Sequence, residues 1–600
     1  MNNTNCGSHP PRAKLAIRVG VTGHRPGGLA RADLKILKEK IRHVLQEIKV
    51  KAEEISRETN SLYHGLQPVL RIISPLAEGS DRIVAHEAID LGYQLQCPLP
   101  YERNEYKKDF STGDSCVEFD SLLEQATSVF EMDGSRLAED SPYLSVGRLV
   151  LEQSDILVTV WDGFQPRGSG GTGQIVMEAV EHMIPVIWIN SRQPHDITIL
   201  GMAADDIKGW VEYLRKQMTY LFLLPVSEGD IKADKLTINL SDYYLSEYHR
   251  ETRHSYRGVA YKLFRKLFGT NFSACEQEKE TKQQTRAITL PDNINKSIDS
   301  VLNCHFKWAD DLANYYAALY RNSFIANYLL GGLAVFFALF SYALGWVDTY
   351  SRYYHYQWVP TVIELVIILY IIVITVYGNK SRWHGKWIDY RLLAELLRHM
   401  KFLAPLGRVN NSFRIPAHQM HNDIRNSWVN WQFRALVREL GLLSVKCDGN
   451  YLESYREYLA KNEIENQIGF HVLNAGHYRR ITHRLHLLGL FLFGGTLVAC
   501  FLHIFYHGYY NAWLTLLSAV LPALGAGFAG ILFQGEFHRL EQRSAAMAKR
   551  LQELKSSLDE MKDFSYADLS RIAKVTAEVM ITEVLDWRIM FQARPLQLPS

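Results

Sequence analysis

The chain has 600 residues, too many for a single hydrophobic core, so we expect two to four domains. Its 66 lysine and arginine residues nearly balance its 64 aspartate and glutamate residues, which argues against a protein that coats nucleic acid. The mean hydropathy of −0.13 is an average over two very different halves. The seven cysteines lack CxxC and zinc-ligand spacing, so we expect reduced packing residues, no disulfide framework and no metal site.

Residues 14–195 alternate strand-like and helical patterns, after a stretch, 1–13, that we expect to be disordered. An apolar strand over 16–25 breaks into a glycine-rich turn, and a long amphipathic helix follows over 32–55. Further strand-like runs lie within 68–82, 93–100, 156–163 and 185–190. This alternation predicts an α/β Rossmann-like domain, in which helices cover both faces of a parallel sheet.

Three loops each follow a predicted strand, and open α/β sheets bind ligands beyond the carboxyl ends of their strands. We therefore predict one site for a nucleotide-type ligand, with no other cofactor, no metal ion and no assigned catalytic residue. The candidate ligand-binding residues are Thr22, Gly23, His24, Arg25, Glu78, Gly79, Asp81, Arg82, Trp161, Asp162, Gly163, Gly170, Gly171 and Thr172. Gly170, Gly171 and Gly173 leave backbone N–H groups open to a phosphate, and the helix start behind them adds positive potential.

The charged side chains of these loops suit a phosphorylated ligand. Asp162 and Glu78 are suited to hydrogen-bond ribose hydroxyls or a base, whereas Arg25 and Arg82 are suited to pair with phosphate. His24 has two interpretations, either a ligand contact or a cap on a backbone carbonyl beside the glycine turn.

Two segments connect this domain to the rest of the chain. Residues 196–275 are mixed in character and rich in tyrosine, and we expect them to form a helical extension. Residues 276–300 are polar and nearly free of aromatic residues, which predicts a flexible linker.

Four apolar stretches follow, over about 324–346, 360–378, 485–506 and 512–533. Each is long enough to cross about 30 Å of hydrocarbon, and soluble helices rarely stay apolar on every face over such a length. The alternative is a set of buried helices in a large soluble core. We predict two transmembrane hairpins, one within residues 301–410 and one, with additional helices outside the membrane, within residues 411–600.

The charges that flank the spans predict their orientation. The loop within the first hairpin has one basic residue, Arg352, and the loop within the second has no Lys or Arg. The other flanks are basic, for example at Lys380, Arg479 and Arg539. The positive-inside rule then places both termini in the cytoplasm, so we expect a multi-pass protein of the inner, cytoplasmic membrane.

The two hairpins resemble each other. A Tyr-Arg pair precedes the first span of each hairpin, a Gly-Gly pair lies inside that span, and Arg391 aligns with Arg543 beyond the second span. Internal duplication is one interpretation and convergent membrane composition is the other. Glu364 is the only acidic residue in a span, and it either lines a pore or reaches headgroups and water near the end of its helix.

The motifs GVTGHR, SPLAEGSDR and SDILVTVWDG with GSGGTG follow one another within residues 14–195. Together they resemble the SLOG superfamily of Rossmann-like nucleotide-binding domains, which includes the DNA-processing protein DprA and the LOG cytokinin-activating phosphoribohydrolases. The LOG enzymes carry a PGGxGTxxE motif whose Glu serves in hydrolysis. Here Ile175 stands at that position, and the first acidic residue of the helix is Glu178. The resemblance therefore implies ligand binding rather than hydrolysis.

The stretch EIENQI at 463–468, the double span, and AEVMITE at 577–583 followed by Trp587 form a second set of features. They resemble the SLATT family of two-helix membrane domains, which are found beside SLOG domains in bacterial conflict systems. The first hairpin resembles a divergent second copy. The SLATT resemblance implies pore formation or membrane disruption in antiphage defence, triggered by a nucleotide-derived signal.

We therefore expect a nucleotide-sensing membrane effector of an antiphage system, a sensor rather than a hydrolase. A nucleotide or nucleotide-derived second messenger would trigger homo-oligomerisation and permeabilisation of the lipid bilayer. The alternative is a membrane-tethered enzyme that hydrolyses or synthesises a nucleotide-derived signal, with Glu78, Asp81 or Asp162 as acid or base. A transporter is a third interpretation, which the paired hairpins favour and the absence of broken polar helices disfavours.

Overall fold

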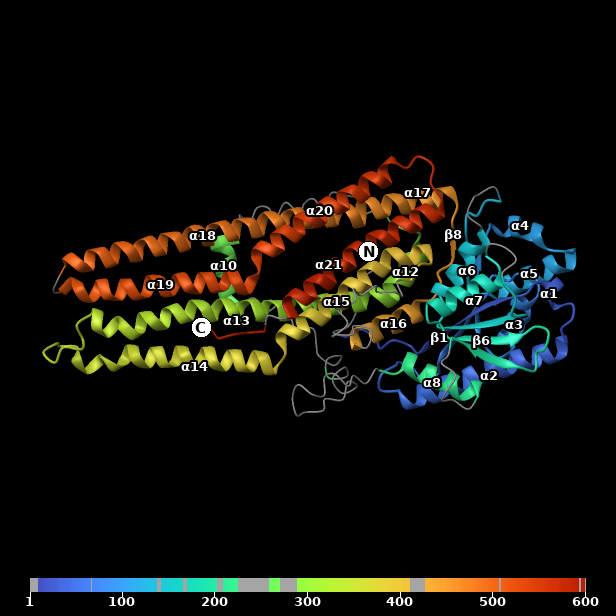
Figure 1. The fold of residues 1–600 in the computed structure, drawn as a ribbon, viewed down its shortest axis with the longest axis horizontal. Coiled ribbons are helices and arrows are strands. Elements are labelled where there is room, and N and C mark those ends of the chain that lie inside the picture. The colour runs from blue at the N-terminus through green and yellow to red at the C-terminus, as the bar shows by residue number, and fades with distance from the viewer. Residues whose placement is uncertain are drawn as a thin grey trace.

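The computed structural model describes residues 9–65, 67–136, 142–165, 170–201, 209–224, 246, 258–269, 289–409, 427–506, 509–592 and 595–598. The molecule is elongated, with an α/β domain at one end and a long bundle of helices that reaches away from it (Figure 1).

The described residues of the α/β domain form an eight-stranded sheet with the order β7-β6-β5-β1-β2-β3-β4-β8. The strands are β1 (Ala16–Gly23), β2 (Val69–Ile73), β3 (Gln94–Leu99), β4 (Ser128–Glu131), β5 (Ile156–Trp161), β6 (Val186–Asn190), β7 (Ile197–Leu200) and β8 (Val445–Lys446). All neighbouring strands are parallel except β6 and β7. β1 is apolar and buried on both faces, as expected of a strand in a covered parallel sheet.

Helices cover both faces of the sheet. α2 (Leu34–Glu58) and α3 (Ser80–Asp90) share one apolar core with β1. α6 (Pro142–Glu152) and α7 (Thr172–Glu181) form a second core with β5 on the other face. The Rossmann-like fold predicted from the sequence is therefore confirmed. Further helices around the sheet are α1 (Pro26–Leu29), α4 (Arg103–Tyr106), α5 (Gly113–Gln125) and α8 (Trp210–Phe222), whereas α10 (Val259–Phe264) packs on a long helix of the bundle.

The chain order places a topological switch point between β1 and β5. From β1 the chain moves outward through β2, β3 and β4, and it then returns to add β5, β6 and β7 on the other side of β1. Open α/β sheets bind ligands where the strand order reverses, beyond the carboxyl ends of the strands. In this sheet those ends are Gly23 of β1 and Trp161 of β5.

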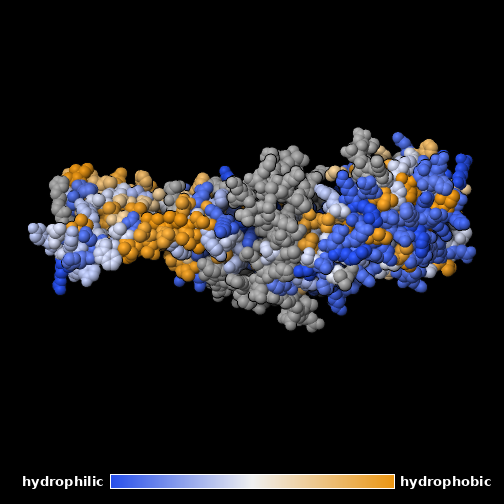
Figure 2. All heavy atoms as spheres, turned by 90° about the horizontal axis from the view of Figure 1, so that it is seen from below, coloured by the Kyte–Doolittle hydropathy of each residue, from blue (hydrophilic) through white to orange (hydrophobic). Residues whose placement is uncertain are grey.

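Four helices among the described residues are long and apolar enough to cross a membrane. They are α13 (Cys304–Ala343), α14 (Trp358–Lys380), α18 (Asn466–Phe505) and α19 (Tyr509–Gly535). α13 packs along α14, and α18 packs along α19, so the predicted arrangement of two hairpins is confirmed. Figure 2 shows apolar side chains in a band over this part of the molecule, as expected of a surface that faces lipid.

The two hairpins share an order of elements that the comparison of their sequences predicted only in part. A π-helical turn precedes each 40-residue helix, over Asp299–Asn303 before α13 and over Tyr458–Glu465 before α18. A residue with positive φ follows the second helix of each hairpin. It is Arg382 (51°) after α14 and Glu536 (48°) after α19. These breaks redirect the chain into α15 (Trp383–Leu403) and α20 (Phe537–Glu560). The shared order of elements favours internal duplication over convergent composition.

Several expected boundaries differ from the structure. β7 lies just beyond residue 195, where we expected the sheet to end. The expected linker contains the helix α12 (Asp292–Ile298), and its residues 276–288 lie outside the described part of the chain. The remaining helices between and after the spans are α16 (Trp428–Leu440), α17 (Gly449–Glu457) and α21 (Tyr566–Gln592).

The segment between the two hairpins completes the N-terminal sheet. β8 pairs in parallel with β4, with Val445 opposite Phe130 and Lys446 opposite Glu131. The side chain of Lys446 also forms an ion pair with Glu102, at 2.9 Å. The α/β domain is therefore not an independent N-terminal unit, because a strand from the membrane half is part of its sheet.

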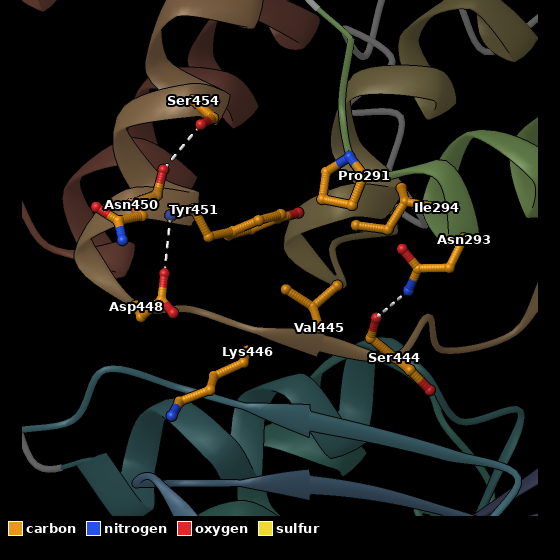
Figure 3. A pocket seen from close by; sticks show the side chains of 10 residues that line it. All are labelled: Pro291, Asn293, Ile294, Ser444, Val445, Lys446, Asp448, Asn450, Tyr451 and Ser454. Carbon is orange, nitrogen blue, oxygen red and sulfur yellow. Dashed lines mark hydrogen bonds between the residues drawn. The ribbon is translucent and has the colours of Figure 1, made fainter.

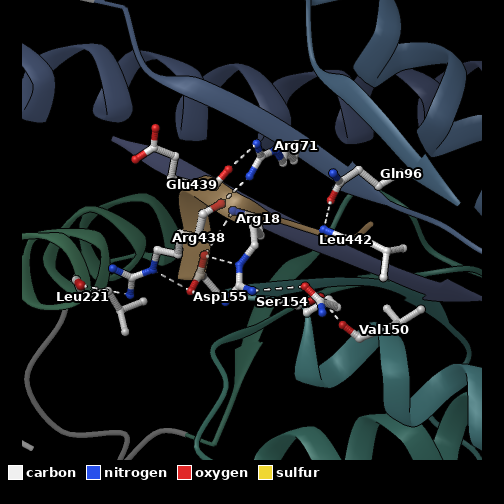
Figure 4. A network of polar contacts seen from close by, with 11 residues as sticks. Arg18, Arg71, Gln96, Val150, Ser154, Asp155, Leu221, Arg438, Glu439 and Leu442 are labelled. Atoms are coloured by element: carbon white, nitrogen blue, oxygen red, sulfur yellow. Dashed lines mark hydrogen bonds and ion pairs between the residues drawn. The ribbon is translucent and has the colours of Figure 1, made fainter. Parts of the chain in front are cut away.

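A buried ion network joins the sheet to α16 (Figure 4). The Asp155 carboxylate accepts hydrogen bonds from Arg18 Nε at 3.2 Å and from Arg438 Nε at 2.8 Å. All three residues are less than 5 % exposed. Burial opposes the charge of Asp155, but the two guanidinium groups outweigh it and hold the pKa of this carboxyl well below its usual range. Arg71 donates to the carbonyl oxygens of Arg438 and Glu439, which fixes the end of α16 against β2.

The cysteine expectation is correct for Cys97, Cys116, Cys447 and Cys500, which are free. It is wrong for Cys304, at the start of α13, which is disulfide-bonded. The spacing of cysteines in a sequence does not determine their pairing, so this bond could not be predicted.

Candidate functional site

The structure brings the three candidate loops together at the carboxyl ends of β1, β2 and β5. The amide of His24 donates to the carbonyl oxygen of Val160 at 3.0 Å, which joins the first loop to the third. The carbonyl oxygen of His24 accepts hydrogen bonds from the amide of Ser80 at 3.0 Å and from its hydroxyl at 2.9 Å, which joins the first loop to the second. These loops therefore meet at the switch point of the sheet.

Gly79 makes the close approach of the first two loops possible. Its φ is +100°, and a Cβ atom at this position would lie 2.5 Å from the carbonyl oxygen of His24. A side chain is therefore excluded by both the backbone conformation and the neighbouring loop. The sequence indicated a ligand-binding glycine here, whereas the structure shows a glycine that lets two loops touch.

The third loop continues into the start of α7. Gly171 is the N-cap residue of α7, and Thr172 is its first residue. Gly170 has a φ of +78°, packs against the amide of Leu144, and donates its own amide to Oε1 of Gln174 at 3.0 Å. The partial positive charge at the start of α7 therefore lies on the loop that follows β5, where a phosphate is expected.

His24 and Asp162 tie the first loop to the third. His24 Nε2 lies 3.0 Å from Asp162 Oδ1 and 3.1 Å from the Asp162 amide. The other carboxylate oxygen of Asp162 lies 3.4 Å from Arg192 Nη2. Burial opposes the charge of Asp162, but the hydrogen bond to His24 and that from the Phe164 amide outweigh it and lower the pKa of this carboxyl. The contacts favour a positioning role for Asp162 rather than the ribose contact expected from the sequence.

Glu78 and Arg82 both hold α5 in place. Glu78 accepts hydrogen bonds from the Ser111 amide at 2.7 Å and from the hydroxyl of Ser115, and these bonds outweigh burial and lower the pKa of its carboxyl. Arg82 is buried, donates to Glu118 at 2.9 Å, and lies over the ring of Phe110. Both side chains therefore form their contacts within the protein. The contacts of Arg82 favour a structural role over the phosphate contact expected from the sequence.

Arg25 was predicted from the sequence, but the side chains that surround it were not. Its guanidinium lies 5.3 Å from the ring centre of Tyr143, at the start of α6. The hydroxyl of Tyr143 donates to Asp109, which in turn forms an ion pair with Arg136 at 2.8 Å. Arg25 is exposed, whereas Glu78, Asp81, Arg82 and Asp162, the other candidate charged residues that the structure describes in these loops, are buried or half-buried.

Four buried polar atoms near these loops have no partner within the described structure. They are Asp81 Oδ1, Arg82 Nη2, Thr159 Oγ1 and Ser191 Oγ. Thr159 lies in β5, in register with Thr22 of β1, so the two hydroxyls share one face of the sheet at the switch point. Buried polar atoms are almost always paired, so unpaired ones make this edge a candidate site for a polar molecule. A threonine within the apolar strand ILVTVW was the available signal for Thr159.

Among the described carboxyls of this edge, Asp81 has the pKa that is shifted furthest from its usual value. It is the second residue of α3 and is 4 % exposed. Burial raises the pKa of Asp81 to about 7, against the weaker opposing effects of the Ala77 amide, Arg25 and Arg82. Near neutral pH this group therefore exchanges a proton, and in its protonated form it is able to donate a hydrogen bond.

We expect Asp81→Asn to stabilise the fold at alkaline pH. An unfolded Asp has a pKa of about 3.9, so between about pH 4 and pH 7 the unfolded chain releases a proton that the folded chain keeps. The contribution of Asp81 to the free energy of unfolding is therefore fully present below about pH 4 and is lost as the pH rises through 7. Asp81→Asn should raise the free energy of unfolding at pH 8 by about 2–4 kcal/mol, measured by urea unfolding in detergent.

The matched control is Asp90→Asn, at the other end of the same helix, where the carboxylate is 66 % exposed. This change should leave the dependence of stability on pH as it is in the parent chain. Equal responses of the two variants would show that the burial of Asp81 does not govern its ionisation.

Two hollows of the described structure lie away from these loops. The larger, of about 360 Å³, lies between α12, β8 and α17 (Figure 3). Two of its polar side chains already have partners, since Asn293 donates to the carbonyl oxygen of Ser444 and Asp448 caps α17. We therefore place the candidate site at the switch point, where the unpaired buried atoms are.

Among the described residues, no group of three or more His, Cys, Asp or Glu side chains is placed to hold a metal ion. The described residues of this edge supply hydroxyls, backbone amides, the exposed arginines Arg25 and Arg192, and the carboxyl of Asp81, whose pKa is raised to about 7. No protein-family model matches the chain, and no curated protein matches it either.

Proposed function

We propose that this chain is a membrane-embedded sensor, in which the α/β domain binds a nucleotide-derived signal and the two hairpins permeabilise the bilayer in response. The observation that carries the proposal is that Asp81 Oδ1, at the start of α3, and Thr159 Oγ1, in β5, are buried and unpaired within the described structure, in elements that meet at the switch point of the sheet. An unpaired buried polar atom costs about 1–3 kcal/mol, so these two atoms are suited to contact a polar ligand. The resemblance of residues 14–195 to SLOG domains and of 455–595 to SLATT domains supports the two halves of the proposal.

The connection between the two halves supports a signalling role. β1 ends at Gly23 beside the candidate site and carries Arg18 near its other end. β5 ends at Trp161 and is preceded by Asp155. The two strands that bear candidate loops therefore also carry the ion pair that holds Arg438 of α16. A ligand that displaces either strand acts directly on the segment between the hairpins.

The proposed setting is the inner membrane of a bacterium, with the α/β domain in the cytoplasm. The basic residues at the sheet-facing ends of the spans support this orientation. Binding would favour a homo-oligomer in which hairpins of several copies assemble. A change from mostly closed to mostly open requires roughly 5 kcal/mol of difference in ligand affinity between the two states.

Dye release from vesicles tests the proposal. The full chain is reconstituted in phosphatidylethanolamine–phosphatidylglycerol vesicles, and nucleotide fractions of a bacterial extract are added. We expect release with one or more fractions and none with the same fractions after phosphatase treatment. Vesicles that stay tight with every fraction would overturn the proposal.

A membrane-tethered enzyme is the second candidate, and Asp81 is the observation that favours it. A buried carboxyl with a pKa of about 7 is suited to general acid–base catalysis near neutral pH. Turnover of a nucleotide by the full chain, abolished by Asp81→Asn, would favour the enzyme. Binding without turnover would favour the sensor.

A further inference from the structure

Residues 595–598 lie against the sheet-facing ends of the apolar spans. The side chain of Asn379, in α14, donates to the carbonyl oxygen of Leu596 at 3.0 Å. The side chain of Gln534, in α19, donates to the carbonyl oxygen of Pro595 at 3.0 Å. α14 belongs to the first hairpin and α19 to the second. The 595–598 segment therefore connects the two hairpins through its backbone.

The side chain of Leu596 fills the space beside this connection. It is 3 % exposed, and a Cβ atom on Gly378 of α14 would lie 2.5 Å from its Cδ1 atom. Gln534 also donates to the hydroxyl of Tyr320 in α13, at 2.7 Å, so three of the four spans meet at this place. By contrast, Leu598 is 48 % exposed.

Aromatic side chains fix the end of α21, from which this segment continues. Trp387 of α15 lies 4.8 Å from Trp587 and 5.4 Å from Phe591, measured between ring centres. The carbonyl oxygen of Phe591 also accepts a hydrogen bond from His384. This end of α21 is therefore anchored to the helix that directly follows α14.

The other end of α21 touches the sheet. The amide of Tyr566 donates to Asp133, just after β4, at 2.8 Å, and its ring packs on Phe130 of β4. The hydroxyl of Tyr566 donates to the carbonyl oxygen of Leu406 at 2.7 Å. A helix of 27 residues is about 40 Å long, so one rigid element reaches from the sheet to the spans.

We propose that the 595–598 segment is an autoinhibitory latch, which holds the two hairpins together and which α21 withdraws when the α/β domain responds to its ligand. The inference rests on the proposed function for its trigger. The contacts it depends on are the two backbone hydrogen bonds and the burial of Leu596. Displacement of α21 at Tyr566 acts on the latch, because α21 is one helix that reaches from the sheet to Gln592, close to the latch in the chain.

Maleimide labelling tests the contact itself, without any ligand. Leu596→Cys and Leu598→Cys are compared in the full chain in vesicles, and labelling of the parent chain sets the background from its own cysteines. We expect labelling at position 596 to be at least about tenfold slower than at 598, because it requires local opening. Equal rates would overturn the latch.

Dye release tests its consequence. We expect Leu596→Asp to release dye without nucleotide, at about ten times the rate of the parent chain, because a buried carboxylate expels the segment. Leu598→Asp is the matched control and should remain as tight as the parent. If nucleotide opens the parent but Leu596→Asp stays tight without it, the latch is wrong and the proposed function stands. If no variant leaks under any condition, the proposed function fails as well.

Discussion

Asp155→Asn is expected to destabilise the α/β domain more than any other single change of charge in the molecule. It leaves Arg18 and Arg438, both about 2 % exposed or less, without their shared carboxylate. The removal of one partner from a buried ion network costs about 3–5 kcal/mol, because the remaining charges stay out of water. Urea unfolding in detergent should show this loss, together with release of α16 from the sheet, seen as faster proteolysis within α16.

The same substitution should change the response of the protein to acid. The pKa of Asp155 is depressed in the folded state, so its contribution is present above the unfolded pKa of about 3.9 and is lost as the pH falls below it. The parent chain should therefore lose stability steeply below about pH 4. Asp155→Asn should show a smaller loss over the same range, since it has no carboxylate to protonate there.

Glu102→Gln is the control for this prediction. Glu102 pairs with Lys446 of β8 and so joins the same two parts of the chain, but both side chains are about half exposed. Exposed ion pairs contribute little, so its unfolding curve should match that of the parent. If both variants unfold alike, the buried network does not hold the two parts together.

The fold could be predicted largely because its signals are local. Continuous apolar strands followed by glycine turns predicted β1, β2 and β5, and their chain order predicted the parallel sheet. The spans carry a signal of length and hydropathy that needs no tertiary contact. β8 could not be predicted, because a two-residue strand has no periodicity and its pairing with β4 joins residues more than 300 positions apart.

The meeting of the three candidate loops could be predicted, whereas the contacts of their side chains could not. The three loops follow from strand ends, which are visible in the sequence, and they do meet. The role of each side chain depends on distant partners. Glu78 and Arg82 turn toward Ser115 of α5, and Arg25 lies against Tyr143 of α6, and neither contact follows from a local pattern. Similarly, the hydroxyl of Thr159 is of interest because it has no hydrogen-bond partner among the described residues, and a sequence does not show this.

Gly79→Ala is expected to abolish ligand binding while the rest of the molecule stays folded. The φ of +100° is unfavourable for alanine, and the new methyl group would lie 2.5 Å from the carbonyl oxygen of His24. Since that oxygen holds both Ser80 hydrogen bonds, relief of the clash separates the first two loops. We expect an affinity at least about a hundredfold below that of the parent for any nucleotide that binds it, a loss of about 3 kcal/mol.

Gly92→Ala separates this effect from backbone strain. Gly92 ends the helix that Gly79 begins, has a φ of +87°, and has no atom within 4 Å of the position of a Cβ. Both variants should lose about 1–2 kcal/mol of stability from the unfavourable backbone conformation, but Gly92→Ala should bind as the parent does. Mass spectrometry of nucleotides that co-purify with the three full-length proteins, followed by titration calorimetry, measures the difference. Undiminished binding by Gly79→Ala would mean that the first two loops do not need to touch for the ligand to be held, and that the site lies elsewhere on the sheet.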